Sequence, residues 1–354
     1  MKIFFRFIGI LVTVAAASLA VAGFAAGYIP PEEKEWISFP GLILLPVLAV
    51  NLVMFGIWVA VRSGWLWVPL VALLLNAGFI LSMFQVRVWP RSDVPVSEQI
   101  KIITYNVDNF SAGGRSTLDE IARWVESQHP DIVCLQECPP AYVMPIDSVV
   151  SRFRFFPYAC TTRMADEGSA LAIFSRYPIL HCEPVLYPGT SNKTLVATLL
   201  VRGDTIRVIN NHLQTTSVNA VKPRLYQAKA ERDALEGTEA AFQMAFQMKR
   251  NFVLRAEQAD FVRQLIRSSS VPVIVTGDFN DTPASYTYHR VKGLLTDGFR
   301  DAGSGFGYTF RELRRLFRID YIFYSSNFRG IRYDSPDLPF SDHNPVVCTI
   351  FEKP

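Results

Sequence analysis

The sequence of 354 residues is poor in charge: 19% of its residues are Asp, Glu, Lys or Arg, whereas 50% are hydrophobic. Disordered chains combine low hydrophobicity with high net charge, so this composition excludes an intrinsically disordered protein. The chain also lacks internal repeats and low-complexity tracts. Its length exceeds that of one average domain, and it predicts a compact catalytic domain joined to a second part.

A large excess of basic residues is also missing, because the net charge is only +3. Residues up to Arg91 include six basic and three acidic side chains, and the remainder carries 29 of each sign. Domains that bind nucleic acid are usually basic, since phosphate contacts dominate their affinity. The neutral C-terminal part therefore argues against a strongly basic binding domain and leaves room only for a local basic patch.

The five cysteines show no paired Cys-x-x-Cys spacing; they are Cys134, Cys138, Cys160, Cys182 and Cys348. This odd, irregular set argues against both a disulfide framework and a structural zinc site. Cys134 and Cys348 lie within apolar runs, so we expect them to be small buried hydrophobic residues.

Residues 1–90 are predicted to form a membrane anchor. Three uncharged stretches, at about 7–29, 38–61 and 65–86, are each long enough for a helix to cross the hydrocarbon core. The first stretch follows Lys2 and Arg6 and ends in small residues, so a cleavable signal peptide is an alternative. An uncleaved helix is preferred because two further apolar stretches follow directly. Three such runs in succession also disfavour buried helices of a soluble protein.

The basic residues near these stretches predict an orientation. Lys2, Arg6 and the Arg62 turn would face the cytoplasm, and an odd number of spans would place the C-terminal domain outside it. Arg87 and Arg91 follow the last stretch and weaken this bias. The sequence thus predicts an integral, multi-pass membrane protein with an extracytoplasmic domain.

After a linker at 91–99, residues 100–354 read as an α/β domain. Thr117 and Glu120 form a capping box that predicts a helix ending near His129. Short turns join several strands, which favours mixed sheets flanked by helices. The expected strands are Lys101–Val107, Asp131–Leu135, Ser169–Phe174, Thr194–Val201, Thr205–Asn211, Val271–Thr276, Ile319–Tyr324 and Pro345–Phe351.

Residues 219–268 are almost without Gly and Pro and are predicted to be helical, with a break near Gly237. Two interpretations remain open for the apolar residues in this segment. They form either an amphipathic arm that lies on membrane or substrate, or, as is more common, a stripe that packs on the domain.

Polar residues follow four of the expected strands directly. Functional side chains gather at strand ends in α/β folds, because the rigid sheet holds the loops there. Carboxylate and amide oxygens are the ligands that Mg²⁺ prefers. Five residues at these strand ends provide them: Asn106, Glu137, Asp278, Asn280 and Asp342.

Between about residues 100 and 352 the sequence resembles the endonuclease/exonuclease/phosphatase superfamily, which includes DNase I-like metal-dependent phosphohydrolases. The resemblance implies a four-layer α/β sandwich with two packed mixed sheets between helices. The matching segments, in order, are Thr104–Val107, Asp131–Glu137, Gly168–Pro178, Asn210–Leu213, Gly277–Asn280, Arg318–Ile322 and Ser341–Val346.

The resemblance also implies roles for individual residues. Asn106, Glu137 and Asp342 resemble the ligands of Mg²⁺, or of Mn²⁺ in its place. Asp278 and Asn280 resemble the residues that activate the attacking water and hold the phosphate, and His343 would act on the phosphate with Asp320 fixing its tautomer. The remaining matches are His212, on the opposite side of the phosphate, and the substrate-binding residues Asn210, Tyr308 and Thr309.

These roles imply a membrane-anchored, metal-dependent phosphodiesterase that cleaves a P–O bond by in-line attack of water. Nucleic acid, phospholipid and small phosphoesters remain open as substrates, and the sequence identifies no protein partner. The alternative is a catalytically silent family member that acts as a membrane-tethered scaffold. Two departures from the family are the long 219–268 segment and Asn211, which stands where the family pattern Asn-Thr-His has threonine.

Overall fold

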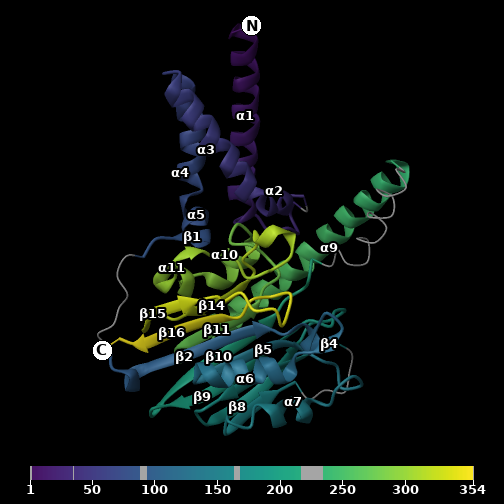
Figure 1. Ribbon diagram of the computed structural model, residues 1–354, viewed down its shortest axis with the longest axis vertical. Helices are drawn as coiled ribbons and strands as arrows, with labels where there is room; N and C mark the ends of the chain where they lie inside the picture. The colour runs from purple at the N-terminus through teal and green to yellow at the C-terminus, as the bar shows by residue number, and fades with distance from the viewer. Residues whose placement is uncertain (1, 35, 88–93, 163–167, 217–233, 354) are drawn as a thin grey trace. The chain divides into compact units, whose positions relative to one another are not determined.

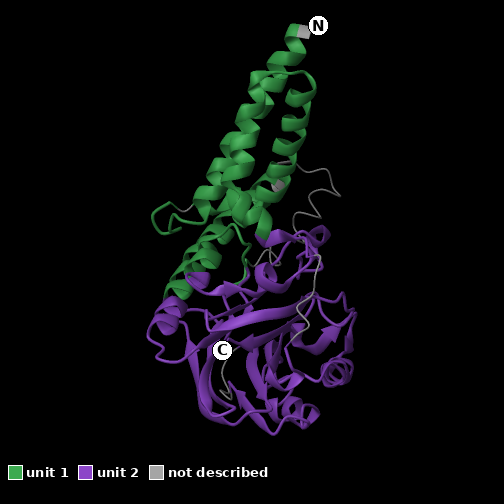
Figure 2. Cartoon of the chain, turned by 90° about the vertical axis from the view of Figure 1, so that its left-hand side faces the viewer, with its two compact units in different colours: residues 1–81, 215–260, 281–290 green, residues 82–214, 261–280, 291–354 purple. Residues whose placement is uncertain are grey.

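The computed structural model describes residues 2–34, 36–87, 94–162, 168–216 and 234–353. The chain divides into two compact units (Figure 2). Unit 1 comprises residues 1–81, 215–260 and 281–290, and unit 2 comprises residues 82–214, 261–280 and 291–354. Part of the expected 91–99 linker lies outside the described residues.

Unit 2 is built on two six-stranded sheets (Figure 1). The strand order is β12-β14-β11-β10-β9-β8 in the first sheet and β15-β16-β2-β5-β7-β6 in the second. The first contains β8 (Ile179–Leu186), β9 (Lys193–Val201), β10 (Asp204–His212), β11 (Val273–Asp278), β12 (Thr296–Asp297) and β14 (Asp320–Tyr324). The second contains β2 (Gln99–Asn106), β5 (Ile132–Cys138), β6 (Tyr158–Thr161), β7 (Ala170–Ser175), β15 (Phe328–Asp334) and β16 (Val346–Glu352).

Both sheets are mixed, as the sequence predicts. The pairs β2/β5 and β10/β11 are parallel, and the other ladders in the two sheets are antiparallel. All eight expected strands are confirmed, with ends that differ by at most three residues. Four strands of the two sheets were not predicted: β6, β8, β12 and β15. Strand β8 is mostly exposed, which explains its weak apolar pattern.

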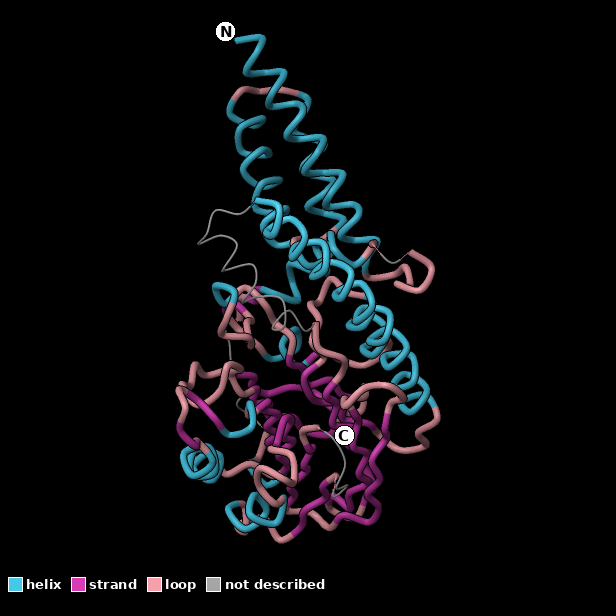
Figure 3. Tube along the Cα trace, turned by 90° about the vertical axis from the view of Figure 1, so that its right-hand side faces the viewer, coloured by secondary structure: helices cyan, strands magenta, loops and turns pink. Residues whose placement is uncertain are grey.

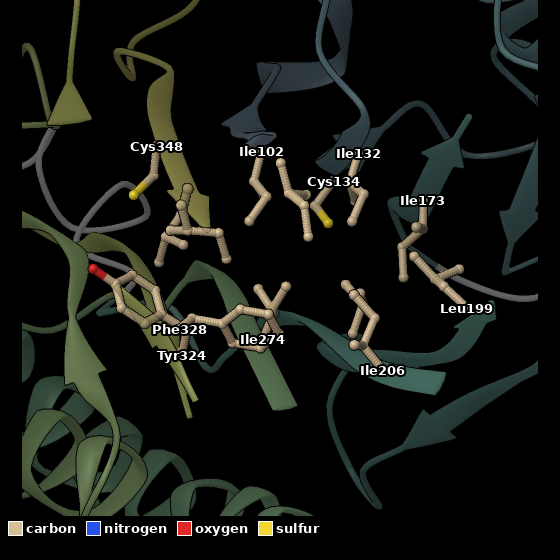
Figure 4. Close-up of a cluster of buried hydrophobic side chains, with 14 of the residues drawn as sticks. Ile102, Ile132, Cys134, Ile173, Leu199, Ile206, Ile274, Tyr324, Phe328 and Cys348 are labelled. Carbon is tan, nitrogen blue, oxygen red and sulfur yellow. The ribbon is translucent and has the colours of Figure 1, made fainter. Parts of the chain in front are cut away.

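The main core lies between the two sheets. Figure 4 shows side chains from both sheets meeting there, with Ile102 and Ile132 from one sheet and Ile206 and Ile274 from the other. Cys134 and Cys348 belong to this core and are fully buried, as expected. Burial of each large apolar side chain contributes roughly 1.5–3 kcal/mol, so this layer is a major source of stability for unit 2.

A second core covers the outer face of β2, β5 and β7. Helices α6 (Leu118–Gln128) and α7 (Ile146–Arg152) contribute Ile121, Val125 and Val149 to it. Helix α6 ends at His129 as predicted, but the capping box is wrong, since Thr117 makes no side-chain cap. The Thr117 hydroxyl donates instead to the carbonyl oxygen of Phe340 at 2.9 Å.

Several short elements complete unit 2. Helix α11 (Gly298–Ala302) packs against β14 and β15. The others are β1 (Phe84–Gln85), β3 (Ser111–Ala112), β4 (Arg115–Ser116), β13 (Gly305–Phe306) and the 3-10 turns η2 (Val96–Glu98), η3 (Asp108–Phe110) and η4 (Leu313–Arg315).

Unit 1 contains the apolar helices of the N-terminal region. They are α1 (Lys2–Ala26), α2 (Ser38–Leu42), α3 (Leu44–Ala60), η1 (Gly64–Leu66), α4 (Trp67–Leu75) and α5 (Ala77–Met83), whose last two residues belong to unit 2. Helices α1, α3 and α4 pack on one another. Three side chains, two from α3 and one from the residue after α4, donate hydrogen bonds to α1. Trp58 Nε1 donates to Thr13 Oγ1 at 2.8 Å, and the amides of Asn51 and Asn76 donate to the carbonyls of Ala16 and Ala20, each at 3.1 Å.

The expectation of about three uninterrupted spans is wrong. Among the described residues, only Ile3–Ala26 is one helix that is long and apolar enough to cross a membrane. The second stretch breaks at Ile43, which leaves the 17-residue α3, and the third breaks at Asn76, where α4 and α5 bend by 58°. If the bent pair counts as one span, there are two candidates.

The expected helical segment 219–268 appears as α9 (Ala234–Arg267), and residues 217–233 lie outside the described part of the chain. Figure 3 shows α9 as one long helix, so the expected break near Gly237 is wrong. The interpretation as a packed apolar stripe is confirmed for the C-terminal half, whereas an arm that lies on membrane or substrate stays a prediction. Phe252, Ala256 and Ala259 are buried, whereas Phe242 and Phe246 remain 61% and 57% exposed. Helix α10 (Tyr286–Lys292) is a further helix of the described residues, and all but its last two residues belong to unit 1.

One disulfide joins Cys160 to Cys182, contrary to what the irregular cysteine spacing suggested. Cys160 lies on β6 and Cys182 on β8, and these strands form edges of the two different sheets. The bond therefore links the two sheets covalently at their edge strands. Backbone hydrogen bonds connect strands only within each sheet, so they cannot provide this link.

Replacing both Cys160 and Cys182 with serine is expected to lower the free energy of unfolding of unit 2 by about 3 kcal/mol, because the bond closes a loop of 22 residues. Urea unfolding of the full chain in detergent, followed by the fluorescence of unit 2, measures this change. Dithiothreitol should destabilise the wild type but not the double variant. Equal stability of the two proteins under oxidising conditions would contradict the structural role of the bond.

Candidate active site

Polar side chains from both sheets of unit 2 meet where the ends of several strands lie together, and the directions of these strands determine which residues meet there. In the parallel pair β2/β5, Asn106 is the last residue of β2 and Glu137 the last but one of β5. The parallel pair β10/β11 ends at His212 and Asp278. Strand β14 runs antiparallel to β11, so its first residue, Asp320, pairs with Asp278. The turn before β16 brings Asp342 and His343 to the same place, since Val346 pairs with Thr104 of β2.

Asn106 bridges the two sheets at this edge. Its Nδ2 donates to Glu137 Oε1 and to Asp278 Oδ2, both at 2.9 Å, and its side-chain oxygen accepts the backbone N–H of Asp108 at 3.1 Å. The side chain is buried, and its amide group makes all three of these hydrogen bonds. Asn106 therefore fixes the separation of two carboxylates from different sheets.

A bulge in β5 aims Glu137 into the site. The register with β7 shifts between Leu135 and Cys138, and Glu137 has a left-handed backbone with φ of 54°. Such a conformation is strained for a residue with a side chain, and strained positions cluster at functional sites. The shift turns the carboxylate out of the strand alternation and toward Asn106.

His212 contacts the same carboxylate from β10. Its Nε2 lies 3.2 Å from Glu137 Oε1 and 3.9 Å from Asp278 Oδ2. Burial works to raise the pKa of Glu137, but the hydrogen bond and charge of His212 outweigh it and hold that pKa at about 2. Burial works to lower the pKa of His212, and the contact with Glu137 raises it above its usual value.

His343 and Asp320 form a buried dyad. His343 Nδ1 lies 2.9 Å from Asp320 Oδ2, and its Nε2 faces Asp278 Oδ2 at 3.8 Å. Burial favours the neutral ring, but the charges of Asp320 and Asp278 hold the pKa of His343 well above its usual range. The dyad thus supplies a protonated imidazole with a fixed orientation.

Asp278 is the acidic centre of this arrangement. Burial is the main cause that raises its pKa to about 6; Asp320 adds to the shift, and His343 opposes it. Its Oδ1 accepts the backbone N–H of Asn280 at 2.7 Å, and Asn280 Nδ2 donates to Asp278 Oδ2 at 3.2 Å. A carboxylate with a pKa near neutrality is suited to accept a proton from a bound water.

Gly277 is required where β11 passes β10. Its φ is 122°, and a Cβ at this position would lie 2.0 Å from the backbone oxygen of Asn211. No side chain fits there, so glycine allows Asp278 and His212 to end their strands side by side.

The three predicted substrate-binding residues lie in different surroundings. Asn210 is fully buried, and its amide donates to the carbonyls of Leu135 and Ala172 in the other sheet. Thr309 is buried as well, and its hydroxyl accepts the backbone N–H of Asp320 at 3.1 Å. Only Tyr308 is partly exposed. The contacts of Asn210 and Thr309 are therefore made within the protein, while a substrate role for Tyr308 stays a prediction.

The sequence reading overlooked Asp108 and two arginines beside the site. A hollow of about 360 Å³ next to Asp342 is lined by Asp108, Arg311 and Arg315, among others. Burial, together with the charges of Asp342 and Glu137, raises the pKa of Asp108 to about 6. Asp108 follows two residues after Asn106, and this proximity was the only sequence signal for it.

The donor set suits a divalent cation. Two groups have ligand atoms within 4.8 Å of one another and share Asp278: Glu137 with His212, and Asp320 with His343. Of the predicted ligands, Glu137 belongs to the first group and Asn106 touches it, whereas Asp342 belongs to neither group and its Oδ1 lies 4.0 Å from His343 Nε2. Burial raises the pKa of Asp342 too. Burial is the main cause of the raised pKa values of Asp278 and Asp342, and the carboxylate oxygens at this site are ligands that a divalent cation prefers.

Three solved structures share this fold. Humanized D. rerio TDP2 with 14 mutations is 19% identical with a TM-score of 0.52, and the match covers 72% of this chain and 99% of that one. An endonuclease/exonuclease/phosphatase from Beutenbergia cavernae is 19% identical with a TM-score of 0.52, covering 72% of each chain. The human Nocturnin catalytic domain with bound sulfate is 16% identical with a TM-score of 0.50, covering 73% and 97%. At these identities the similarity establishes the fold alone.

Sequence comparison gives the family. No curated protein matches the chain, and residues 2–83 match a domain of unknown function. The model of the endonuclease/exonuclease/phosphatase family matches residues 103–343, which is more than half of the chain and includes the whole site. The chain therefore belongs to the endonuclease/exonuclease/phosphatase family and is a hydrolase that acts on phosphoester bonds.

Proposed function

We propose that this protein is a membrane-anchored, divalent-metal-dependent phosphodiesterase that cleaves a P–O bond by in-line attack of water. The observation that carries the proposal is the convergence of Glu137, Asp278 and the His343–Asp320 dyad at one edge of two sheets. Asn106 joins the first two of these by hydrogen bonds.

Asp278 is the proposed base. Its carboxylate accepts a proton from the attacking water, and Asn280 holds the carboxylate through two hydrogen bonds. Water attacks phosphorus opposite the leaving oxygen, and the chain needs no covalent intermediate for this step.

The two histidines are proposed to stabilise the phosphate. His343 is protonated because Asp320 and Asp278 surround it, so its Nε2 can donate a hydrogen bond to a phosphoryl oxygen. His212 lies beside Glu137 and offers a second donor on the other side of Asp278.

Enzymes of this family depend on divalent metals. Glu137, Asn106 and Asp342 would hold Mg²⁺, with Mn²⁺ as a substitute, and these residues supply the oxygen ligands that such ions require. When bound, the ion would neutralise negative charge on the phosphate and on the leaving oxygen.

Hydrolysis by the full chain should require Mg²⁺ or Mn²⁺ and should stop in EDTA. Asp278→Asn and His343→Ala are each expected to lower kcat by roughly 10²–10⁴, because each removes a group that acts in the transition state. Steady-state assays with DNA, RNA, sphingomyelin, inositol phosphates and a synthetic phosphodiester measure this loss and identify the substrate.

His181→Ala is the matched control for these variants, because His181 is exposed on β8 and its Nε2 lies 3.2 Å from Glu183 Oε2, a residue outside the site. Its activity should equal that of the wild type. Lack of turnover on every substrate with either metal would favour the alternative, a catalytically silent scaffold.

The pH dependence follows from the raised pKa of Asp278. The base must be ionised, and its pKa is about 6 before a cation binds, so at low metal concentration kcat/KM should level off above this pH and fall about tenfold per unit well below it. Assays between pH 4.5 and 8 at metal concentrations well below saturation test this, with circular dichroism to confirm folding at each pH. A profile that stays flat down to pH 5 would exclude Asp278 as the base.

Membrane anchoring is proposed for unit 1 because α1 has the length and composition of a spanning helix. Aromatic and basic residues of this unit gather just beyond the end of α1. The Trp36 and Phe39 rings stack with centroids 5.4 Å apart, Phe246 packs on Trp36, and Lys249 Nζ lies 5.4 Å from the Trp36 centroid. Such clusters are typical of the membrane–water interface.

We further propose that the catalytic unit faces away from the cytoplasm. Lys2, Arg6 and Arg62 lie near one end of the apolar segments and favour the cytoplasmic side for that end. The Cys160–Cys182 disulfide supports the same orientation, since disulfides persist mainly in oxidising compartments.

Two measurements in cells test these placements. Sodium carbonate at high pH should leave the protein in the membrane fraction, and release into the supernatant would contradict anchoring. Protease added outside the cytoplasmic membrane should remove a C-terminal tag from the wild type. Full protection of the tag until the membrane is dissolved would reverse the proposed orientation.

A further inference from the structure

A second hollow lies entirely within unit 1, between the first turns of α1 and the last turns of α3. It has a volume of about 770 Å³. Apolar side chains form most of its wall, including Ile8, Val12, Ile57 and Trp58, and the two arginines Arg6 and Arg62 line it as well. The hollow therefore combines an apolar surface with two positive charges.

The sequence provides no nearby negative charge for these arginines. Residues 1–31 and 36–92 contain no Asp or Glu, so the helices that form the hollow carry no carboxylate. Guanidinium groups bind phosphate through paired, charge-assisted hydrogen bonds. Two of them beside an apolar wall match the chemistry of an anionic amphiphile.

Arg62 occupies a backbone position that usually belongs to glycine. Helix α3 ends in a Schellman motif, in which the Ser63 N–H donates to the Trp58 carbonyl at 3.0 Å and the Arg62 N–H donates to the Val59 carbonyl at 3.1 Å. Arg62 has a φ of 51° there. Left-handed backbone is unfavourable for residues with a side chain. The strained arginine thus points to a use for its side chain beyond ending the helix.

We propose that this hollow binds an anionic phospholipid, with the phosphate at Arg6 and Arg62 and an acyl chain along Ile8, Val12, Ile57 and Trp58. The inference rests on the proposed membrane anchoring of unit 1. It also agrees with the proposed orientation, because basic pockets between helices on the cytoplasmic side select anionic headgroups.

The test uses full-length protein in a neutral detergent, with dioleoyl phosphatidylglycerol or dioleoyl phosphatidylcholine added at equal concentration. Phosphatidylglycerol is expected to raise Tm clearly more than phosphatidylcholine and to remain bound in native mass spectra. Arg6→Gln and Arg62→Gln should each weaken retention of phosphatidylglycerol by about tenfold, because each loses one charge-assisted contact to the phosphate. Arg87→Gln removes the same charge outside the hollow and should behave as the wild type.

Arg62→Gly separates lipid binding from helix stability. Glycine fits the left-handed position, so this variant should keep or raise the Tm measured without lipid, yet lose the additional shift from phosphatidylglycerol. If Arg62 only ends the helix, the variant would retain the full lipid response, and the proposal would be wrong.

Two further comparisons identify the bound molecule. Inorganic phosphate and glycerol 3-phosphate lack acyl chains and should produce no shift; a shift as large as that from the lipid would show an anion site and overturn the lipid assignment. Equal responses to both lipids would also overturn it. Failure of the anchoring proposal looks different, because the protein would then leave the membrane in carbonate whatever the lipid.

Discussion

Repulsion between carboxylates at one edge of unit 2 is the constraint on which the site depends. Asp278, Asp320 and Glu137 come from three strands of two sheets, and Asp108 and Asp342 lie beside them. Such charges would separate if they stood on flexible loops. Here the parallel pairs β2/β5 and β10/β11 hold them together, and Asn106, His212 and His343 supply the hydrogen bonds and positive charge that partly compensate them.

A buried polar network joins the sheets just beneath this edge. Gln136 donates to Asn210 Oδ1 at 2.6 Å and to Thr104 Oγ1 at 2.9 Å, while Asn210 donates to the carbonyls of Leu135 and Ala172. Apolar side chains would fill the same space without fixing the register of one sheet against the other. Buried hydrogen bonds are directional, so this network supports the separation of Glu137 and Asp278 that Asn106 fixes. The site is therefore as rigid as the sandwich that carries it.

The sequence predicted the eight principal strands and the polar residues at their ends, because both depend on local pattern. It did not predict features that depend on contacts between distant segments. The β5 bulge at Glu137, the hydroxyl of Thr309 that holds Asp320, and the disulfide between two sheet edges are of this kind. The prediction of three uninterrupted spans was wrong for the same reason. Ile43 and Asn76 interrupt the helices, but both residues are uncharged, so a hydropathy profile does not reveal the breaks.

The account requires Glu137 to belong to a cation site that Asn106 and Asp342 complete. Calorimetric titration of the full chain with Mg²⁺, and with Mn²⁺ as a spectroscopic substitute, tests this requirement most directly. The account predicts saturable binding by the wild type and a loss of at least about tenfold in affinity for Glu137→Gln, which keeps the size of the side chain but removes its charge. Unchanged affinity in that variant, or no binding by the wild type, would contradict it.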